Sequence, residues 1–353
     1  MIKHVPLSLS RRDFMKISSG TLAYLGLSSA LTPKLAEALE KAANKRQPVV
    51  WLHFASDTGC TESLVKADKP GAAELILDIL SIDYNETIMA AGGKQAVENL
   101  KEAVAKGGYI CIVEGGVPTK EGYGMISGRQ MYDIAQEVCG NATAVVGVGS
   151  CSFDGGVPAS TPNPSSIVGI GAFLKSKGID KPVINIPGCP VNPEFLIGTV
   201  VNVLLLGKIP ELDSLGRPKD YFGRTIHDNC PRRSHFDNGH FVEAFGTQAE
   251  ADGFCLYKMG CKGPETHSEC PRILWNERLS WCIGAGSPCI GCMEPGFTDE
   301  FAPFYERLPN VSLPGGRVSA NKVGIGLAVA TGVGIVGHAA GRVVTGSKKE
   351  DNK

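Results

Sequence analysis

Twelve cysteines constrain the fold of this 353-residue chain more than any other feature, because several of them directly follow predicted strands. Four apolar runs have the length and composition of buried strands: 49–54, 109–113, 144–148 and 183–186. Helical patterns at 92–106 and 128–139 separate these runs. Strands that alternate with helices predict an α/β fold with a doubly wound parallel sheet, in which ligands gather beyond the carboxyl ends of the strands.

The loops that leave this predicted sheet carry potential metal ligands. Asp57 and Cys60 follow the first predicted strand, Cys151 follows the third, and Cys189 follows the fourth. Because parallel strands end at a common edge, we expect these four side chains to converge there despite their separation in the sequence. Glycines beside the cysteines leave the backbone free to approach the sulfur atoms.

The second half of the chain, from about residue 206 to residue 309, has few strand patterns and many metal-type side chains. These are His227, Cys230, Cys255, Cys261, Cys270, Cys282, Cys289 and Cys292. The HxxC spacing at 227–230 and the CxxC spacing at 289–292 are typical of metal sites. Export permits disulfides, but a histidine in register with a cysteine favours metal binding.

The composition is that of a globular protein without a bias toward polyanions. Hydrophobic residues make up 43% of the chain, and 35 Lys and Arg balance 36 Asp and Glu. A net charge of -1 gives no electrostatic basis for binding a nucleic-acid backbone. Nucleic acid is therefore not an expected partner.

Both ends carry targeting patterns. The motif SRRDFMK (10–16) precedes an apolar run at 17–31, which predicts a twin-arginine export signal within a signal and linker segment at 1–44. Residues 323–341 are 19 residues without a formal charge, the length of a membrane anchor, with a glycine-rich tail as the alternative. His338 in this segment either faces a partner's haem or makes a helix-to-helix hydrogen bond. We expect the protein on the periplasmic side of the cell membrane.

Five motifs, in this order along the chain, carry a family resemblance. They are GSC (149–151), NIPGCPVNP (185–193), IHDNCPRR (226–233), GFCLYKMGCKGP (253–264) and PCIGCMEPGF (288–297). With them the chain resembles the small subunit of exported, membrane-bound [NiFe] uptake hydrogenases. Asp57 stands where most members have the first cysteine of the proximal cluster, so the chain is a variant of that pattern.

The resemblance implies a flavodoxin-like domain at 45–205, a strand-poor cluster-binding domain at 206–310 and a C-terminal tail at 311–353. It implies an electron-transfer subunit of a hydrogenase that oxidises H2. The nickel–iron site then lies in a separate large subunit, and this chain contains no catalytic residue. Electrons pass through three iron–sulfur clusters to a cytochrome b or a multihaem cytochrome.

The family's motifs also assign cluster ligands to positions of this sequence. The proximal cluster takes Asp57, Cys60, Cys151 and Cys189, the medial cluster takes Cys270, Cys282, Cys289 and Cys292, and the distal cluster takes His227, Cys230, Cys255 and Cys261. Relatives with proline at position 282 hold a three-iron medial cluster, so Cys282 implies that all three clusters are [4Fe–4S]. Cys111 and Cys139 are left over, and we expect them to be small buried hydrophobic residues.

Some of these residues have two interpretations. Asp57 either binds iron directly or caps the following helix while Thr58 or a water molecule completes the iron. Four basic residues near the distal ligands form either a docking surface for an acidic electron acceptor or a solvated face: Lys258, Lys262, Arg232 and Arg233. Glu62 and Glu114 near the proximal loops either set the field of the cluster or have ordinary structural roles.

Two other functions fit parts of the pattern. One is an exported binding module stabilised by zinc, which would use the HxxC and CxxC spacings. The other is the electron-transfer subunit of a different exported reductase, which shares the sheet domain but gives no reason for the ligand block at 227–292. Metal content separates both from a hydrogenase subunit.

Overall fold

The computed structural model describes most of the chain after its first segment. The described residues are 32–33, 46–67, 71, 80–200, 202–203, 209–307, 311–313, 316–318 and 320–350. The predicted export signal at 10–31 lies outside the described residues. The chain divides into two compact units, Met1–Glu306 and Arg307–Lys353.

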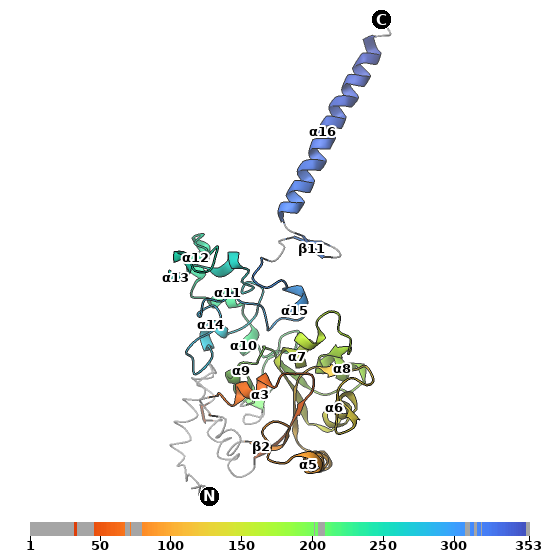
Figure 1. The fold of residues 1–353 in the computed structure, drawn as a ribbon, viewed down its shortest axis with the longest axis vertical. Helices are drawn as coiled ribbons and strands as arrows, with labels where there is room; N and C mark the ends of the chain where they lie inside the picture. Colours follow the sequence, from red (N-terminus) through yellow and green to blue (C-terminus); the bar gives the residue numbers. More distant parts are fainter. Residues whose placement is uncertain are drawn as a thin grey trace. The chain divides into compact units, whose positions relative to one another are not determined.

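The larger unit is built on a five-stranded parallel sheet (Figure 1). Its strands are β1 (Gln47–His53), β2 (Leu80–Asn85), β3 (Ile110–Glu114), β7 (Ala144–Val148) and β9 (Val183–Ile186), in the order β2-β1-β3-β7-β9. Every neighbouring pair is parallel. This is the flavodoxin-like order 2-1-3-4-5, so the predicted doubly wound α/β fold is confirmed.

Four of these strands coincide with the predicted apolar runs, and β2 is the one that the sequence analysis missed. The strands β3 and β7 are buried at every residue, which produces the continuous apolar sequence typical of a parallel sheet. Strand β2 lies at the edge of the sheet, and its sequence LSIDYN is half-buried at Ser81, Ile82 and Asp83. Its polar residues hide it from a search for apolar runs.

Helices cover both faces of this sheet. One face carries α5 (Gly93–Lys106), α6 (Met131–Asn141) and α8 (Ile170–Ser176), and the other carries α3 (Gly59–Leu64) and α9 (Pro193–Val200). Alternate side chains of β1 lie on opposite faces of the sheet. Val50 and Leu52 pack with the first group of helices, and Val49 and Trp51 pack with the second. The helix α7 (Gly149–Asp154) and the 3-10 turn η3 (Val157–Ala159) follow β7.

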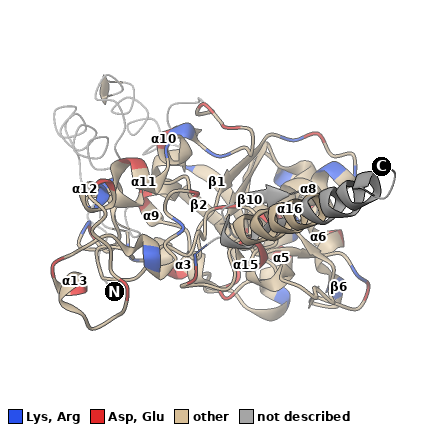
Figure 2. Ribbon diagram, turned by 90° about the horizontal axis from the view of Figure 1, so that it is seen from above, with Lys and Arg blue, Asp and Glu red and all other residues tan. Residues whose placement is uncertain are grey.

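Two short antiparallel ladders lie outside the main sheet. They pair β4 (Val117–Pro118) with β8 (Ile167–Val168), and β5 (Met125–Ile126) with β6 (Arg129–Gln130). Charged residues are spread over the larger unit, and Figure 2 shows Lys and Arg interspersed with Asp and Glu rather than gathered on one face. This distribution agrees with the net charge of -1.

The second half of the larger unit consists of short helices and turns. They are α10 (Lys219–Phe222), α11 (Ile226–Asn229), α12 (Arg233–Asp237), α13 (Gln248–Ala251), η5 (Leu256–Met259), α14 (Cys270–Ile273) and α15 (Phe297–Glu300). Within the described range 209–307 there is no strand of the named set, as the sequence predicted. Tyr221, Leu256, Trp281 and Met293 join the sheet residues in one hydrophobic cluster, so this half packs directly against the sheet.

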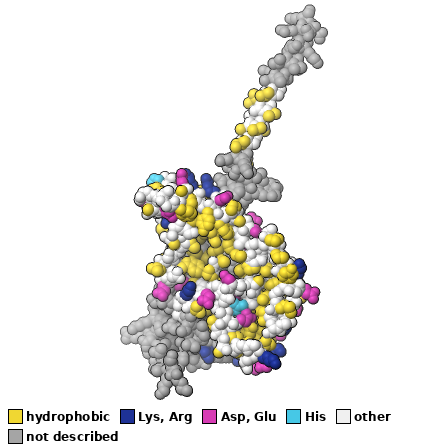
Figure 3. Space-filling model, viewed as in Figure 1, with side chains coloured by type: hydrophobic (Ala, Val, Ile, Leu, Met, Phe, Trp, Pro, Cys, Tyr) yellow, Lys and Arg dark blue, Asp and Glu magenta, His cyan; other side chains and the backbone are white. Residues whose placement is uncertain are grey.

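The smaller unit contains a hairpin of β10 (Val311–Leu313) and β11 (Gly316–Val318), followed by α16 (Ala320–Glu350). The predicted anchor at 323–341 lies within α16, and the side chains of its last three residues lie outside the described part. Large apolar side chains between Ile325 and Val336 are 60% to 69% exposed (Figure 3). Over the described residues, no helix combines the length and the apolar character that crossing a membrane requires.

The two cysteines outside the predicted ligand sets are buried side by side. Cys111 in β3 and Cys139 in α6 are both 0% exposed, and their Sγ atoms lie 3.7 Å apart without a disulfide. Their interpretation as small buried hydrophobic residues is confirmed.

We predict that Cys111→Ala and Cys139→Ala each destabilise the subunit by about 1 kcal/mol, because each removes one atom from a packed core. Thermal unfolding and iron analysis, run beside the unsubstituted protein, measure the two effects. The midpoint should fall slightly while the iron content stays the same. Loss of iron in either variant would contradict the placement of these cysteines in the core.

Candidate metal centres

The loops at the carboxyl edge of the sheet bring the predicted proximal ligands together. The sulfur of Cys60 packs so closely on Gly149, two residues before Cys151, that a Cβ at Gly149 would lie only 2.5 Å from it. The backbone N–H of Val191, two residues after Cys189, donates to Cys60 Sγ at 3.5 Å. The three loops therefore converge, as the parallel sheet predicts.

The proximal side chains also share one electrostatic environment. Burial, together with the negative charges of Cys189 and Asp57, raises the pKa of Cys151 to about 12. Burial and Asp57 raise the pKa of Cys189, and burial with Glu114, Cys151 and Cys189 raises the pKa of Cys60. Such thiols give up their protons when a bound cation offsets the cost of burial, which is the situation of a metal ligand.

A buried carboxylate holds the Cys60 loop in place. Glu114 ends β3 and is 1% exposed, and it accepts the backbone N–H groups of Cys60 at 3.0 Å and Thr61 at 3.1 Å. The imidazole of His53 lies 3.2 Å from this carboxylate and 3.2 Å from that of Glu86. Burial lowers the pKa of His53, but its hydrogen bonds to the two carboxylates outweigh burial and raise the pKa to about 9. The geometry thus supports a structural role for Glu114.

The sequence analysis did not identify His53. The sequence does contain a signal for it, which is a titratable residue at the end of an apolar strand. A charged residue buried at such a position needs a partner of opposite charge. Glu62, the other acidic residue considered near this loop, is exposed. It has no such role in holding the loop.

The structure shows one contact of the Asp57 carboxylate. Its Oδ1 accepts the N–H of Gly59 at 2.9 Å, which satisfies a free donor at the start of α3. Its Oδ2 has no hydrogen-bond partner within the part of the chain that the structure describes. The side chain is exposed, and its charge acts on both Cys151 and Cys189. Binding of iron by Asp57 stays a prediction.

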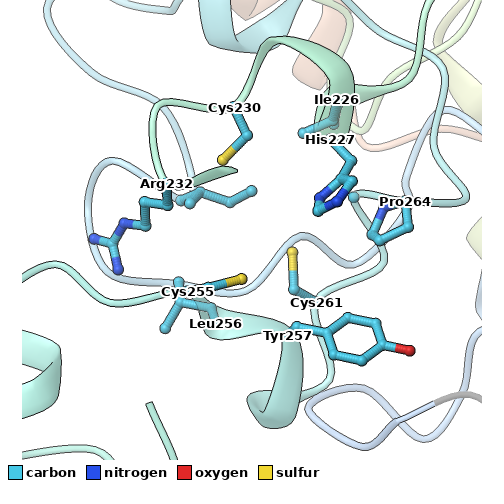
Figure 4. Close-up of a pocket in the computed structure, with 11 residues that line it drawn as sticks. Ile226, His227, Cys230, Arg232, Cys255, Leu256, Tyr257, Cys261 and Pro264 are labelled. Atoms are coloured by element: carbon cyan, nitrogen blue, oxygen red, sulfur yellow. The ribbon is translucent and has the colours of Figure 1, made fainter. Parts of the chain in front are cut away.

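The predicted distal ligands line one cavity in the second half of the unit. His227 lies in α11 and Cys230 follows it, while Cys255 and Cys261 flank the turn η5. The cavity has an empty volume of about 300 Å³, part of it open to solvent. Figure 4 shows the three sulfurs and the imidazole directed into this space.

Local structure fixes the orientation of His227. A capping box between Thr225 and Asp228 begins α11, and Phe236 packs edge-on against the imidazole with ring centroids 4.5 Å apart. Burial and the nearby charge of Arg233 lower the pKa of His227. Neutral imidazole, the form that binds metals, is therefore favoured.

The predicted medial ligands lie within electrostatic reach of one another. Burial raises the pKa of Cys270 to about 11, and the thiol of Cys282 contributes to the increase. Burial also raises the pKa of Cys292, to which Cys270 and Cys282 add, and the pKa of Cys289, to which Cys292 and Cys270 add. These mutual effects on the pKa values agree with the prediction that the four cysteines come together.

Backbone N–H groups point at the sulfurs of these sets. The N–H of Gly291 donates to Cys289 Sγ at 3.3 Å. The other N–H donors are those of Val157 to Cys151, Arg232 to Cys230, Tyr257 to Cys255, and Gly263 to Cys261. Such donors stabilise the thiolate, which is the form that binds iron. The residues present therefore fit iron–sulfur clusters.

The medial set touches both of the other sets. The hydroxyl of Ser150, next to the proximal Cys151, donates to the backbone carbonyl of Cys292. The backbone N–H of Lys262, next to the distal Cys261, donates to the carbonyl of Cys289 at 2.8 Å. The three sets therefore form one continuous row with the medial set in the middle.

The geometry disfavours the other uses of cysteine. All twelve cysteines are free, so the chain has no disulfide framework. Among the described residues, no three His, Cys, Asp or Glu side chains are close enough to hold one metal ion.

One of the basic residues predicted near the distal end is not on the surface. Lys262 is 2% exposed, so its prediction as a docking residue is wrong. The turn at Cys261 directs Lys262 inward, where its backbone N–H donates to the carbonyl of Cys289 at 2.8 Å. Lys258 and Arg233 are exposed and form surface ion pairs.

Two family models match the chain. The model of the C-terminal part of the NiFe/NiFeSe hydrogenase small subunit matches residues 222–305. The model described as NADH ubiquinone oxidoreductase, 20 Kd subunit, matches residues 58–203. The two matches correspond to the cysteine-rich half and to the sheet.

Similar proteins agree with the first of these models. The chain is 46% identical over 302 residues to the periplasmic [NiFe] hydrogenase small subunit of Solidesulfovibrio fructosivorans, an alignment that covers 85% of this chain and 93% of that protein. It is 43% identical over 343 residues to the quinone-reactive Ni/Fe-hydrogenase small chain of Wolinella succinogenes, covering 94% and 95%. A chain of the [NiFeSe]-hydrogenase of Dm. baculatum superposes with a TM-score of 0.70 at 34% identity, over 74% of this chain and 99% of that chain. The chain belongs to the family of [NiFe] hydrogenase small subunits.

We predict that Gly149→Ala disrupts the proximal site, because Gly149 has a φ of 82° and its new Cβ would meet the Cys60 sulfur. The complex should lose about four irons, the content of one cluster. Iron analysis and electron paramagnetic resonance (EPR) measure the loss.

Gly128→Ala is the matched control, because Gly128 has a φ of 77° but no atom within 4 Å of its added Cβ. This variant should keep its iron. An unchanged iron content in Gly149→Ala would mean that the three loops do not share one metal site.

Proposed function

We propose that this chain is the electron-transfer subunit of a [NiFe] hydrogenase that oxidises H2 and that it holds three iron–sulfur clusters in a row. The observation that carries the proposal is the pair of contacts between neighbouring ligand loops, Ser150 to Cys292 and Lys262 to Cys289. An electron relay needs carriers that follow one another at short range, and these contacts link the three sets without a gap. Family membership supplies the partner subunit that cleaves H2.

The clusters that we propose are all [4Fe–4S]. Asp57, Cys60, Cys151 and Cys189 hold the proximal cluster, Cys270, Cys282, Cys289 and Cys292 hold the medial cluster, and His227, Cys230, Cys255 and Cys261 hold the distal cluster. When bound, such clusters supply reversible one-electron transfer. The chemistry of H2 is left to the nickel–iron site of the large subunit.

The residues of this chain position the clusters and tune them. Glu114 fixes the Cys60 loop, and the N–H donors offset the negative charge on the sulfurs. Buried apolar side chains such as Trp281 and Ile283 exclude water from the region of the medial and distal ligands. Water exclusion strengthens the effect of each nearby charge on the clusters.

The proximal end is the one that we assign to the large subunit. Asp57 and Cys189 are exposed there, and so are Val65 at 43%, one turn beyond Cys60, and Val157 at 54%. Exposed apolar groups around a buried polar site mark an interface. On the face in Figure 3, hydrophobic side chains gather in a broad central area of the larger unit.

The distal end is where we propose that electrons leave. His227 contributes no negative charge as a neutral imidazole, so its cluster has a higher potential than one held by four thiolates. Lys258 and Arg233 are exposed nearby and suit an acidic acceptor. We propose a cytochrome b as the acceptor, in line with the relative named quinone-reactive, with a multihaem cytochrome as the second candidate.

Localisation follows from the two ends of the chain. We propose export by the twin-arginine route through the motif at 10–16, with the protein on the periplasmic side of the cell membrane. The exposed apolar side chains of α16 support attachment of the complex to that membrane. We further propose boundaries at 44/45, 205/206 and 310/311 between signal, sheet domain, cluster domain and tail.

Metal analysis and EPR of the complex isolated from its native membrane test this function. We expect one nickel in the partner, about twelve irons with this chain, and cluster signals that appear on exposure to H2. Zinc in place of iron would identify the binding module instead. Iron with a partner that lacks nickel would contradict the proposal.

We predict that Asp57→Cys changes the EPR spectrum and the midpoint potential of the proximal cluster, because a thiolate is a softer ligand than a carboxylate. Redox titration followed by EPR measures both. Glu62→Gln is the control, since Glu62 is exposed in α3, the helix that follows Asp57, and lies outside the ligand sets. If Asp57→Cys behaves like this control, Asp57 is not a ligand.

We predict that Cys282→Ala converts the medial cluster to a three-iron form, because three thiolates remain to hold it. The complex should contain about eleven irons and show the EPR signal of an oxidised three-iron cluster. Retention of all irons with an unchanged spectrum would remove Cys282 from the ligand set.

A further inference from the structure

Lys262 occupies an unusual place for a lysine, the interior between two ligand sets. It is 2% exposed, although lysine is among the residues that are almost never fully buried without a partner. Its backbone is held from both sides, because its N–H donates to the carbonyl of Cys289 at 2.8 Å and its carbonyl accepts the hydroxyl of Thr266 at 2.7 Å. These hydrogen bonds fix the backbone at Lys262, and the side chain lies in the interior.

The ammonium of Lys262 has little compensation from the protein. Its Nζ donates to the backbone carbonyl of Glu306, and within the described residues no carboxylate lies within ion-pair distance of it. The buried guanidinium of Arg217 shows the contrast, since it pairs with Asp213 at 2.8 Å and Glu294 at 3.2 Å. An ammonium buried beside neutral groups alone carries a large desolvation cost.

Lys262 contacts cysteines of two different ligand sets. Cys261 of the distal set directly precedes it in the chain, and its backbone N–H donates to the carbonyl of Cys289 of the medial set at 2.8 Å. Burial lowers the pKa of Lys262, while the thiols of Cys261 and Cys289 and the carboxyl of Glu306 act in the opposite direction. Lys262 thus stands at the junction between the medial and distal sites.

We propose that the buried ammonium of Lys262 compensates the negative charge of the medial and distal clusters together and raises both of their reduction potentials. The inference rests on the proposed function. A cluster held by thiolates has a net negative charge that grows on reduction, and a fixed cation nearby stabilises the reduced form more than the oxidised form. The proximal cluster, whose ligands do not interact with Lys262, is affected least.

Substitutions at Lys262 separate its charge from its hydrogen bond. Lys262→Gln removes the charge and keeps an N–H donor for the Glu306 carbonyl, Lys262→Met removes both, and Lys262→Arg keeps both. Lys219→Met is the control, because Lys219 is exposed at 47%, pairs with Glu211 on the surface, and lies outside the ligand sets and the proposed docking surface. Each variant is purified as the full complex, and its clusters are titrated by EPR against potential.

We expect Lys262→Gln and Lys262→Met to shift the medial and distal midpoint potentials to more negative values, with the smaller shift at the proximal cluster. Lys262→Arg and Lys219→Met should stay close to the unsubstituted complex. Unchanged medial and distal potentials in both neutral variants would overturn the inference. Equal shifts in Lys262→Arg and in the neutral variants would also overturn it, because the charge would then not be the cause.

Cluster loss is informative as well. If both neutral variants lack the medial and distal irons while Lys262→Arg retains them, the positive charge is required to hold the clusters, as the inference states. If Lys262→Arg loses them too, Lys262 acts through packing and the inference fails. The unsubstituted complex tests the proposed function separately, because its failure would appear there as missing nickel or missing iron signals.

Discussion

The structure depends on one physical constraint, which is that thiolates cannot be buried without a compensating cation. Cys60, Cys255, Cys270 and Cys289 are all buried, and burial raises the pKa of each. Without iron, these groups remain protonated thiols. Cluster binding therefore contributes directly to the folding free energy of this chain. The proposed export by a route that carries folded proteins fits this coupling, because the clusters are then inserted before the chain leaves the cell.

The doubly wound sheet brings together ligands that are far apart in the sequence. Loops after β1, β7 and β9 meet at one edge, and the carboxylate at the end of β3 ties the first of these loops down. The second half of the unit has no sheet of its own in the range 209–307, and its apolar side chains complete the core on the α3 and α9 face. Because both halves share that core, the order of the three ligand sets is fixed by packing rather than by a flexible connection.

Features that depend on a local sequence pattern or on the topology of the sheet were predicted, and features that depend on contacts between distant residues were not. Buried strands with continuous apolar runs were predicted, and so was the convergence of Cys60, Cys151 and Cys189, because parallel topology makes it necessary. The edge strand β2 was missed, since Ser81 and Asp83 interrupt its apolar residues. The interior position of Lys262 was also missed, because the surroundings of a lysine in a turn depend on contacts with Cys289 and Glu306, far along the chain. Side-chain motifs predict which residues bind, and tertiary contacts determine what surrounds them.

The central claim is that twelve side chains hold three clusters in a row. Diffraction data from crystals of the complete heterodimer, collected on both sides of the iron absorption edge, test it most directly. The account predicts three compact groups of iron, one within bonding distance of each ligand set, with the group at Cys270 and Cys292 between the other two. Anomalous signal at the zinc edge instead, or an iron group bound by side chains outside the three sets, would contradict it.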